Sequence, residues 1–235
     1  MRVRVGTSGY NFPEWKGTFY PAKIKPPEML PYYAGRLSTV EINYTFYRMP
    51  NAKTVAGWNE AVPAEFTFVL KAPQRITHIA RLRDVDDPLR YFTETVRPLG
   101  AKLGPILVQL PPNFKQDLAR LKDFLTLFPA DLRCAFEFRH ASWFADDTYA
   151  ALRGANAALC VADTEVGHTP LVATADFGYF RLRDEGYTPD DIARWGETIA
   201  RETAACRDVF VYFKHEESGK GPEFARLLMG RLGLG

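Results

Sequence analysis

The sequence predicts an α/β protein in which eight parallel strands close into a TIM-like (β/α)8 barrel. Short apolar segments alternate with amphipathic ones along the whole chain, which is the pattern of repeated strand–helix units around a parallel sheet. The chain has 235 residues, and barrels of this size commonly form one undivided domain. No linker, repeat or low-complexity tract divides the sequence. We therefore expect a single barrel domain over residues 1–235.

Eight apolar runs are the predicted strands: Arg2–Gly6, Thr39–Ile42, Phe66–Leu70, Ile106–Leu110, Cys134–Phe138, Ala158–Ala162, Tyr179–Leu182 and Val209–Phe213. Three of the intervening helices have predicted capping residues, namely Asp87, Asp117 and Thr188. Only fifteen residues separate Asp163 from Tyr179, and they include two glycines and a proline. We therefore expect the sixth crossover to be irregular, because a regular crossover helix needs about a dozen residues or more.

An open doubly wound sheet is the alternative fold, and it usually has a glycine-rich nucleotide-binding turn after its first strand. Gly6-Thr7-Ser8-Gly9 follows the first strand here, but Pro13 and Trp15 come next and no helix begins there. The sequence favours a structural turn that brings Tyr10 and Trp15 over the mouth of a barrel.

Composition limits the possible classes of protein. Hydrophobic residues make up 46% and charged residues 25%, as in ordinary globular proteins. No tract approaches the roughly 18 apolar residues of a membrane span, and the first residues lack the apolar region of a signal peptide, so we expect a cytoplasmic protein without a membrane partner. The net charge of +2 is lower than that of a dedicated nucleic-acid binder. Cys134, Cys160 and Cys206 show no C-x-x-C spacing and are predicted to be reduced thiols.

The segment from Ala135 to Trp143 carries the strongest functional signal. It begins as an apolar strand and then places a carboxylate, a guanidinium, an imidazole and an indole within seven residues. Glu137 and Arg139 alternate on one face of the strand, about 7 Å apart. Two charges cannot lie deep in an apolar core unless they pair or meet solvent or a ligand. This strand is therefore predicted to run out of the core into a site.

Polar residues also follow the other apolar runs. They are Thr7, Ser8, Glu41, Asn43, Lys71, Gln109, Asp163, Arg181, Arg183, Lys214 and His215. A barrel brings the carboxyl ends of its strands to one face, which is where barrel enzymes have their active sites. We therefore expect these residues to converge on one pocket.

Candidate catalytic roles follow from the residue types. Glu137 is the candidate base, since Arg139 should keep it ionised, and His140 could shuttle a proton. Asp163 is a further candidate. Lys71 and Arg181 would stabilise developing negative charge. A Schiff base on Lys71 is disfavoured, because Glu41 is expected to pair with it and raise its pKa.

Two other chemistries remain open alternatives. Glu41 and Glu137 could act as a glycosidase pair, for which their separation would decide between retention and inversion. A metal site could use Glu137, Asp163 and three histidines, but no close ligand spacing such as H-x-H or H-E-x-x-H is present. We therefore expect neither a metal nor a cofactor.

Anion binding has more support from the pattern of cations. The third loop contains Lys71, Arg75, Arg81 and Arg83, and the last two loops add Arg181, Arg183, Lys214 and Gly219-Lys220-Gly221. The segments after the first and fifth strands are expected to supply aromatic surface nearby, from Tyr10, Trp15, Phe19, Tyr20, Trp143 and Phe144. Tyr10 and Trp143 are expected to be stacking walls. Cations interleaved with aromatics suit a nucleotide, a sugar phosphate or single-stranded nucleic acid.

The chain resembles the YecE-like family, also called domain of unknown function 72. The resemblance rests on Gly6 to Tyr10, Trp15 to Pro21, Val40 to Pro50, Lys71 to His78, Gln109 to Pro112, Glu137 to Trp143, Asp163, Tyr179 and Arg181. It implies an eight-stranded barrel, and Thr7, Asn43, Tyr47 and Gln109 become expected ligand-binding residues. It implies no reaction. The chain departs from the family pattern at Arg183-Asp184, where His-Gly is usual, and at Lys214-His215, where two asparagines are usual.

Three hypotheses about function follow. The pocket could bind a phosphorylated small molecule and belong to a hydrolase- or lyase-like enzyme. It could instead be a non-catalytic module that binds single-stranded nucleic acid, with an affinity that falls steeply with salt. In the third hypothesis the charges form a closed ion-pair network that only stabilises the barrel mouth.

Overall fold

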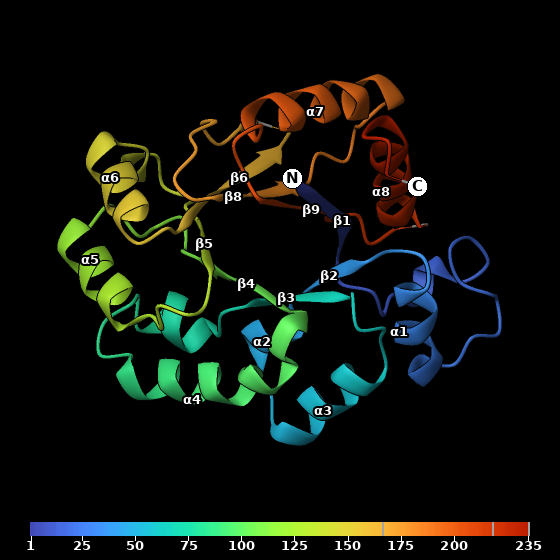
Figure 1. Cartoon of the computed structure of the whole chain (residues 1–235), viewed down its shortest axis with the longest axis horizontal. Coiled ribbons are helices and arrows are strands. Elements are labelled where there is room, and N and C mark those ends of the chain that lie inside the picture. Colours follow the sequence, from blue (N-terminus) through green and yellow to red (C-terminus); the bar gives the residue numbers. More distant parts are fainter. Residues whose placement is uncertain (166, 218, 235) are drawn as a thin grey trace.

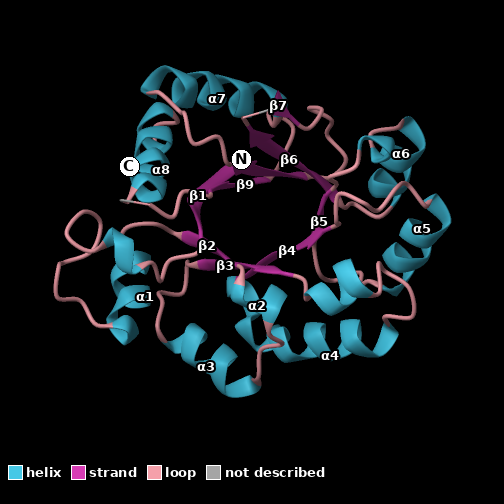
Figure 2. Ribbon diagram, turned by 180° about the vertical axis from the view of Figure 1, so that it is seen from behind, coloured by secondary structure: helices cyan, strands magenta, loops and turns pink. Residues whose placement is uncertain are grey.

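A closed ring of parallel strands forms the centre of the protein, and helices surround it (Figures 1 and 2). The computed structural model describes residues 1–165, 167–217 and 219–234. The ring contains β1 (Arg2–Ser8), β2 (Thr39–Ile42), β3 (Thr67–Lys71), β4 (Leu103–Gln109), β5 (Cys134–Glu137), β6 (Ala158–Thr164), β8 (Phe177–Leu182) and β9 (Asp208–Phe213). Neighbouring strands pair in parallel, and the β5–β6 and β1–β9 pairings close the ring. The predicted barrel and all eight predicted strands are confirmed.

The helices lie outside the ring in chain order: α1 (Pro26–Ala34), α2 (Tyr44–Tyr47), α3 (Ala52–Glu60), α4 (Asp86–Val96), α5 (Leu118–Leu127), α6 (Asp146–Gly154), α7 (Pro189–Glu202) and α8 (Lys220–Arg231). Asp117 and Thr188 cap α5 and α7 as predicted, each accepting a hydrogen bond from a backbone N–H in the first turn. The predicted cap at Asp87 is wrong, since α4 begins one residue earlier, at Asp86. None of the described helices is long and apolar enough to cross a bilayer.

The sixth crossover is irregular, as predicted. Among its described residues, only the two-residue strand β7 (Gly167–His168) is regular, and it pairs antiparallel with the end of β6. Thr174 then anchors the return to the barrel, because its hydroxyl donates to the Ala157 carbonyl and accepts from the Leu159 N–H. Side-chain hydrogen bonds therefore hold this segment where other crossovers have a helix.

Alternation along the strands divides the core into two parts. Inward-facing side chains fill the barrel and include Val69, Leu107, Ala135, Cys160, Tyr179, Phe210 and Tyr212. Outward-facing side chains pack against the helices in a larger cluster. The next inward position at the carboxyl end of each strand is therefore the place where a side chain enters the barrel mouth. The cysteines are free, as predicted, and burial raises the pKa of Cys134 to about 12.

The turn after β1 is structural, as expected. A single turn of 3-10 helix, Pro13–Trp15, follows it. Trp15 is buried, and its indole N–H donates to the carbonyl of Glu216 at 2.7 Å, which ties this turn to the segment after β9. Tyr10 lies at the barrel mouth. Tyr10 and Phe12 of this turn line the mouth, whereas Trp15, which was expected there, belongs to the core.

Candidate functional site

A pocket of about 960 Å³ lies at the carboxyl ends of the strands. Its polar wall contains Ser8, Asn43, Lys71, Gln74, His78, Gln109, Arg139, Arg181, Arg183, Lys214 and Glu216. Its aromatic wall contains Tyr10, Phe12, Tyr44, Phe46, Tyr47 and Trp58. The predicted convergence on one pocket is therefore present for Ser8, Asn43, Lys71, Gln109, Arg181, Arg183 and Lys214, and absent for Thr7, Asp163 and His215. Phe46, Trp58 and His78 were not among the predicted site residues, although Phe46 and His78 lie in the motifs of the family resemblance. They follow β2 and β3 and could have been found as aromatic or titratable residues in loops that begin at the mouth.

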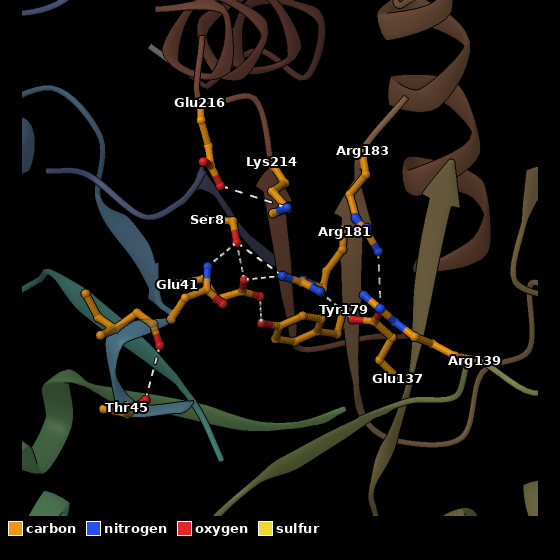
Figure 3. A network of polar contacts seen from close by, with 12 residues as sticks. Ser8, Glu41, Thr45, Glu137, Arg139, Tyr179, Arg181, Arg183, Lys214 and Glu216 are labelled. Carbon is orange, nitrogen blue, oxygen red and sulfur yellow. Dashed lines mark hydrogen bonds and ion pairs between the residues drawn. The ribbon is translucent and has the colours of Figure 1, made fainter. Parts of the chain in front are cut away.

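The floor of the pocket is a buried ion-pair network that connects strands across the barrel (Figure 3). The guanidinium of Arg181 on β8 lies 2.7 Å from a carboxylate oxygen of Glu41 on β2 and 2.5 Å from one of Glu137 on β5. Ser8 and Tyr179 donate hydroxyl hydrogen bonds to Glu41. All three charged side chains are at most 2% exposed. Their charges therefore have to be compensated within this network.

Glu137 contacts three guanidinium groups. Besides Arg181, Arg139 donates to it at 3.1 Å and Arg183 lies 3.6 Å away. Burial by itself would raise the pKa of this carboxyl, but the cations, Arg181 foremost, hold the pKa well below its usual value. The prediction that Arg139 keeps Glu137 ionised agrees with this geometry. Glu137 therefore holds the three guanidinium groups in place and so determines where positive charge lies in the pocket.

Lys71 does not form the expected ion pair with Glu41. Glu41 pairs with Arg181 instead, and Nζ of Lys71 lies 3.8 Å from the centre of the Phe46 ring. Burial, followed by the charge of Arg181, lowers the pKa of Lys71 to about 8, against an ordinary value of 10.5. Glu137 and Glu41 raise this pKa, but by less than burial and the cations lower it. The premise that disfavoured Schiff-base chemistry, a net rise in the pKa of Lys71, is therefore wrong.

His78 lies on the same side of the pocket. Its ring packs edge-on against Phe46, and Nδ1 is 2.9 Å from the hydroxyl of Thr77. Burial, followed by the positive charge of Lys71, lowers the pKa of His78 to about 4. The imidazole is therefore neutral near pH 7 and adds no positive charge to the wall.

Two predicted site residues point away from the pocket, because they occupy outward positions on their strands. Asp163 of β6 accepts hydrogen bonds from the Tyr187 hydroxyl and the Trp195 indole, on the α7 side of the barrel. Thr7 of β1 contacts the hydroxyl of Tyr33 in α1 at 2.8 Å. Both are structural contacts between the barrel and its helices. The structure therefore does not bring Asp163 and Thr7 into the pocket where a catalytic and a ligand-binding role were expected for them.

His140 and Trp143 also lie outside the pocket wall. His140 caps a 3-10 turn, Ala141–Trp143, through a hydrogen bond from the Ser142 N–H. Trp143 is fully buried, stacks on Phe138 with ring centres 4.7 Å apart, and donates its indole N–H to the Phe114 carbonyl at 2.7 Å. The predicted stacking wall at Trp143 is therefore part of the core. His140 is not placed to move a proton within the pocket.

Replacing Trp143 by phenylalanine is expected to lower the free energy of unfolding by about 1–3 kcal/mol, because the Phe114 carbonyl would stay buried without its donor. Denaturant unfolding would measure this cost. Ligand affinity should stay unchanged in the folded variant, and a large loss of affinity at equal stability would place the indole back in the site.

The predicted anion site at the last two loops is only partly assembled. Arg181, Arg183 and Lys214 line the pocket, and Lys214 lies 3.8 Å from Glu216. Lys220 pairs with Glu223 at the surface, and Gly219 packs against Thr18, so the start of α8 faces away from the pocket. Of the third-loop cations, Lys71 alone is among the described lining residues. Within the described ranges, no group of three or more His, Cys, Asp or Glu side chains is arranged as a metal site.

The fold and the pocket together define a β/α-barrel protein with a charged, aromatic-walled pocket at the carboxyl ends of its strands. The chain belongs to the DUF72 family: residues 4–235 match the family model described as "Protein of unknown function DUF72". The predicted resemblance is therefore confirmed.

Relatives and solved structures agree with this assignment. The chain is 35% identical to the UPF0759 protein YecE of Escherichia coli K12 over 114 residues, a match that spans 48% of the chain and 42% of YecE. The chain therefore spans less than half the length of this curated relative. It is 23% identical to the UPF0759 protein YunF of Bacillus subtilis over 99% of the chain and 95% of YunF. A DUF72 family crystal structure from Thermotoga maritima superposes with a TM-score of 0.89 at 27% identity, covering 99% of this chain and all of that one.

Proposed function

We propose that the pocket binds a phosphate-bearing small molecule. The observation that carries this proposal is the surplus of cations in the pocket. Five cationic side chains are among its described lining residues, whereas Glu216 is the one carboxylate among them, and Glu41 and Glu137 lie beneath, engaged by Arg181. Arg139, Arg183 and Lys214 keep between about a fifth and two fifths of their side chains exposed, so they can reach a ligand. Guanidinium groups suit phosphate because their N–H groups match its oxygens in pairs.

The aromatic wall supports a ligand with a planar or apolar part next to its phosphate. Tyr10, Phe12, Phe46 and Trp58 line the side of the pocket formed by the segments after β1 and β2. A nucleotide or a sugar phosphate has both parts, and its ring would lie on the aromatic wall while its phosphate meets the arginines. In this arrangement Glu137 is a positioning residue, which holds three guanidinium groups in place.

Calorimetric titration with inorganic phosphate and with nucleoside monophosphates tests the proposal. Arg183→Met and Lys214→Met are each expected to weaken binding about tenfold, which corresponds to about 1.4 kcal/mol for a lost charge-assisted contact. Arg207→Met is the matched control, since Arg207 precedes β9 at the opposite end of the barrel and pairs with Asp176. Equal affinities for all three variants and the parent protein would contradict the proposal.

Single-stranded nucleic acid is the second candidate ligand. Tyr44 and Tyr47 of α2 line the same pocket and are 45% and 72% exposed, so their rings could stack with bases. Fluorescence anisotropy with labelled single-stranded DNA and RNA should then show saturable binding that weakens as salt rises. Tyr47→Ala should cost about 1–3 kcal/mol of binding free energy. An absence of binding at low salt would remove this candidate.

A further inference from the structure

We propose that Lys71 is a carbonyl-reactive amine that forms an imine with an aldehyde or ketone group of the ligand. The proposal extends the proposed function, on which it rests for the phosphate that would bring the ligand to the pocket. It names the class of substrate: a phosphate-bearing carbonyl compound.

The fold fixes the position of this amine. Lys71 is the last residue of β3 and continues the inward alternation of Val69, so its side chain enters the barrel mouth and lines the pocket. The hydroxyl of Thr45 donates to its backbone carbonyl at 2.7 Å, which secures the end of the strand. The stem is buried, and Nζ lies over the Phe46 ring. A nucleophile held in this way needs little reorganisation before it meets a bound carbonyl.

The ion-pair network leaves this amine without a carboxylate partner. Arg181 engages both Glu41 and Glu137, and Nζ of Lys71 makes no hydrogen bond or ion pair with any residue in the described ranges. Burial, Arg181 and Arg139 disfavour the charged form more than Glu137 and Glu41 favour it, so the pKa is about 8 and an appreciable share of the amine is neutral near pH 8. Reactive lysines are activated by burial and by neighbouring cations, and Lys71 has both.

The chemistry balances without a further reactant. The neutral Nζ attacks the carbonyl carbon, the N–C bond forms, and the electron pair of the C=O double bond moves to oxygen, which takes up the proton that the nitrogen releases. The resulting carbinolamine loses its hydroxyl group and a nitrogen-bound proton as water, which leaves the imine. A protonated imine withdraws electrons from the adjacent carbon, so it suits the cleavage of a neighbouring C–C or C–H bond, in keeping with a lyase-like activity.

Pyridoxal 5′-phosphate is a suitable probe, because it combines an aldehyde, an aromatic ring and a phosphate. The full chain would be incubated with it, the imine reduced with borohydride, and the labelled lysines identified by peptide mass mapping. Lys71 is expected to label at least about tenfold faster than Lys220, an exposed lysine paired with Glu223. Lys71→Met should abolish this fast labelling, and the control variant Lys220→Met should retain it. The rate at Lys71 should reach half its maximum near pH 8, where an exposed lysine requires about pH 10.4.

The outcomes separate the two proposals. Labelling of Lys71 no faster than that of Lys220, in a protein that binds inorganic phosphate, would overturn the reactive amine and leave the phosphate site standing. Fast labelling of Lys71 by pyridoxal and its phosphate ester alike, with no competition from inorganic phosphate, would support the reactive amine and contradict the phosphate site. Fast labelling that depends on the phosphate and is slowed by inorganic phosphate would support both.

Discussion

Replacing Arg181 by leucine is expected to lower the free energy of unfolding by about 3–5 kcal/mol. The substitution leaves Glu41 and Glu137 buried, each at most 1% exposed, without the cation that pairs with both. Glu137 would still contact Arg139 and Arg183, but Glu41 would keep only hydroxyl donors, Ser8 and Tyr179. Urea unfolding monitored by circular dichroism measures the cost.

Two further variants control this experiment. Glu137→Gln removes one charge of the same network and, by the same reasoning, should also destabilise the protein by about 3–5 kcal/mol. It replaces the Arg181 variant in this experiment if that variant does not fold. Arg97→Met breaks an exposed ion pair with Asp131 and should change stability little. Equal stabilities for the Arg181 and Arg97 variants would show that the buried network does not stabilise the barrel, and would sink the hypothesis of a structural ion-pair cluster.

The loss of folding stability at acid pH should depend on the same network. The folded-state pKa of Glu137 lies below its ordinary value of 4.5, so its ionised form stabilises the fold above pH 4.5. This contribution is lost as the pH falls below 4.5 towards the folded-state pKa. In Glu137→Gln the fall in stability with acid should therefore be shallower than in the parent protein.

Replacing Lys71 by methionine is expected to raise the free energy of unfolding, by about 1–3 kcal/mol at pH 7. The folded-state pKa of Lys71 is about 8 and its ordinary value is 10.5, so the folded protein binds this proton less strongly than the unfolded chain does. The charged amine therefore destabilises the fold at full strength below pH 8. Methionine keeps the length of the side chain without the charge.

The direction of the pH dependence follows from the same two values. As the pH rises from 8 to 10.5 the unfolded chain binds more protons than the folded one, so the parent protein gains stability relative to the variant. The advantage of Lys71→Met should thus disappear above pH 10.5. Thermal unfolding of both proteins between pH 7 and pH 10.5 provides the measurement, and a variant less stable than its parent at pH 7 would contradict the prediction.

The fold could be predicted from the sequence because each strand is a compact apolar run. The buried positions of Phe68 to Leu70 and Val209 to Phe213, for example, are apolar on both faces, as strands between a barrel interior and its helices must be. The site could be predicted in part for the same reason. Glu41, Glu137 and Arg181 end such runs, and the closed ring brings them together.

The alternation of inward and outward side chains along each strand distinguishes the predicted residues that reach the pocket from those that do not. Lys71 continues the inward series through Val69, and Glu137 continues the one through Ala135, whereas Asp163 follows the outward-facing Val161. This signal is present in the sequence and could have excluded Asp163. The pairing partners could not have been predicted, since the choice of Arg181 rather than Lys71 for Glu41 depends on where side chains cross the barrel interior.

The buried network also limits how molecules exchange with the pocket. Glu41, Arg181 and Glu137 span the barrel axis, and Tyr179, Phe210 and Tyr212 fill the interior beneath them. The pocket is therefore closed at its base, and any molecule that enters through the mouth must leave through it. For an enzyme built on this barrel, product would have to depart before the next substrate could arrive, so product would act as a competitive inhibitor.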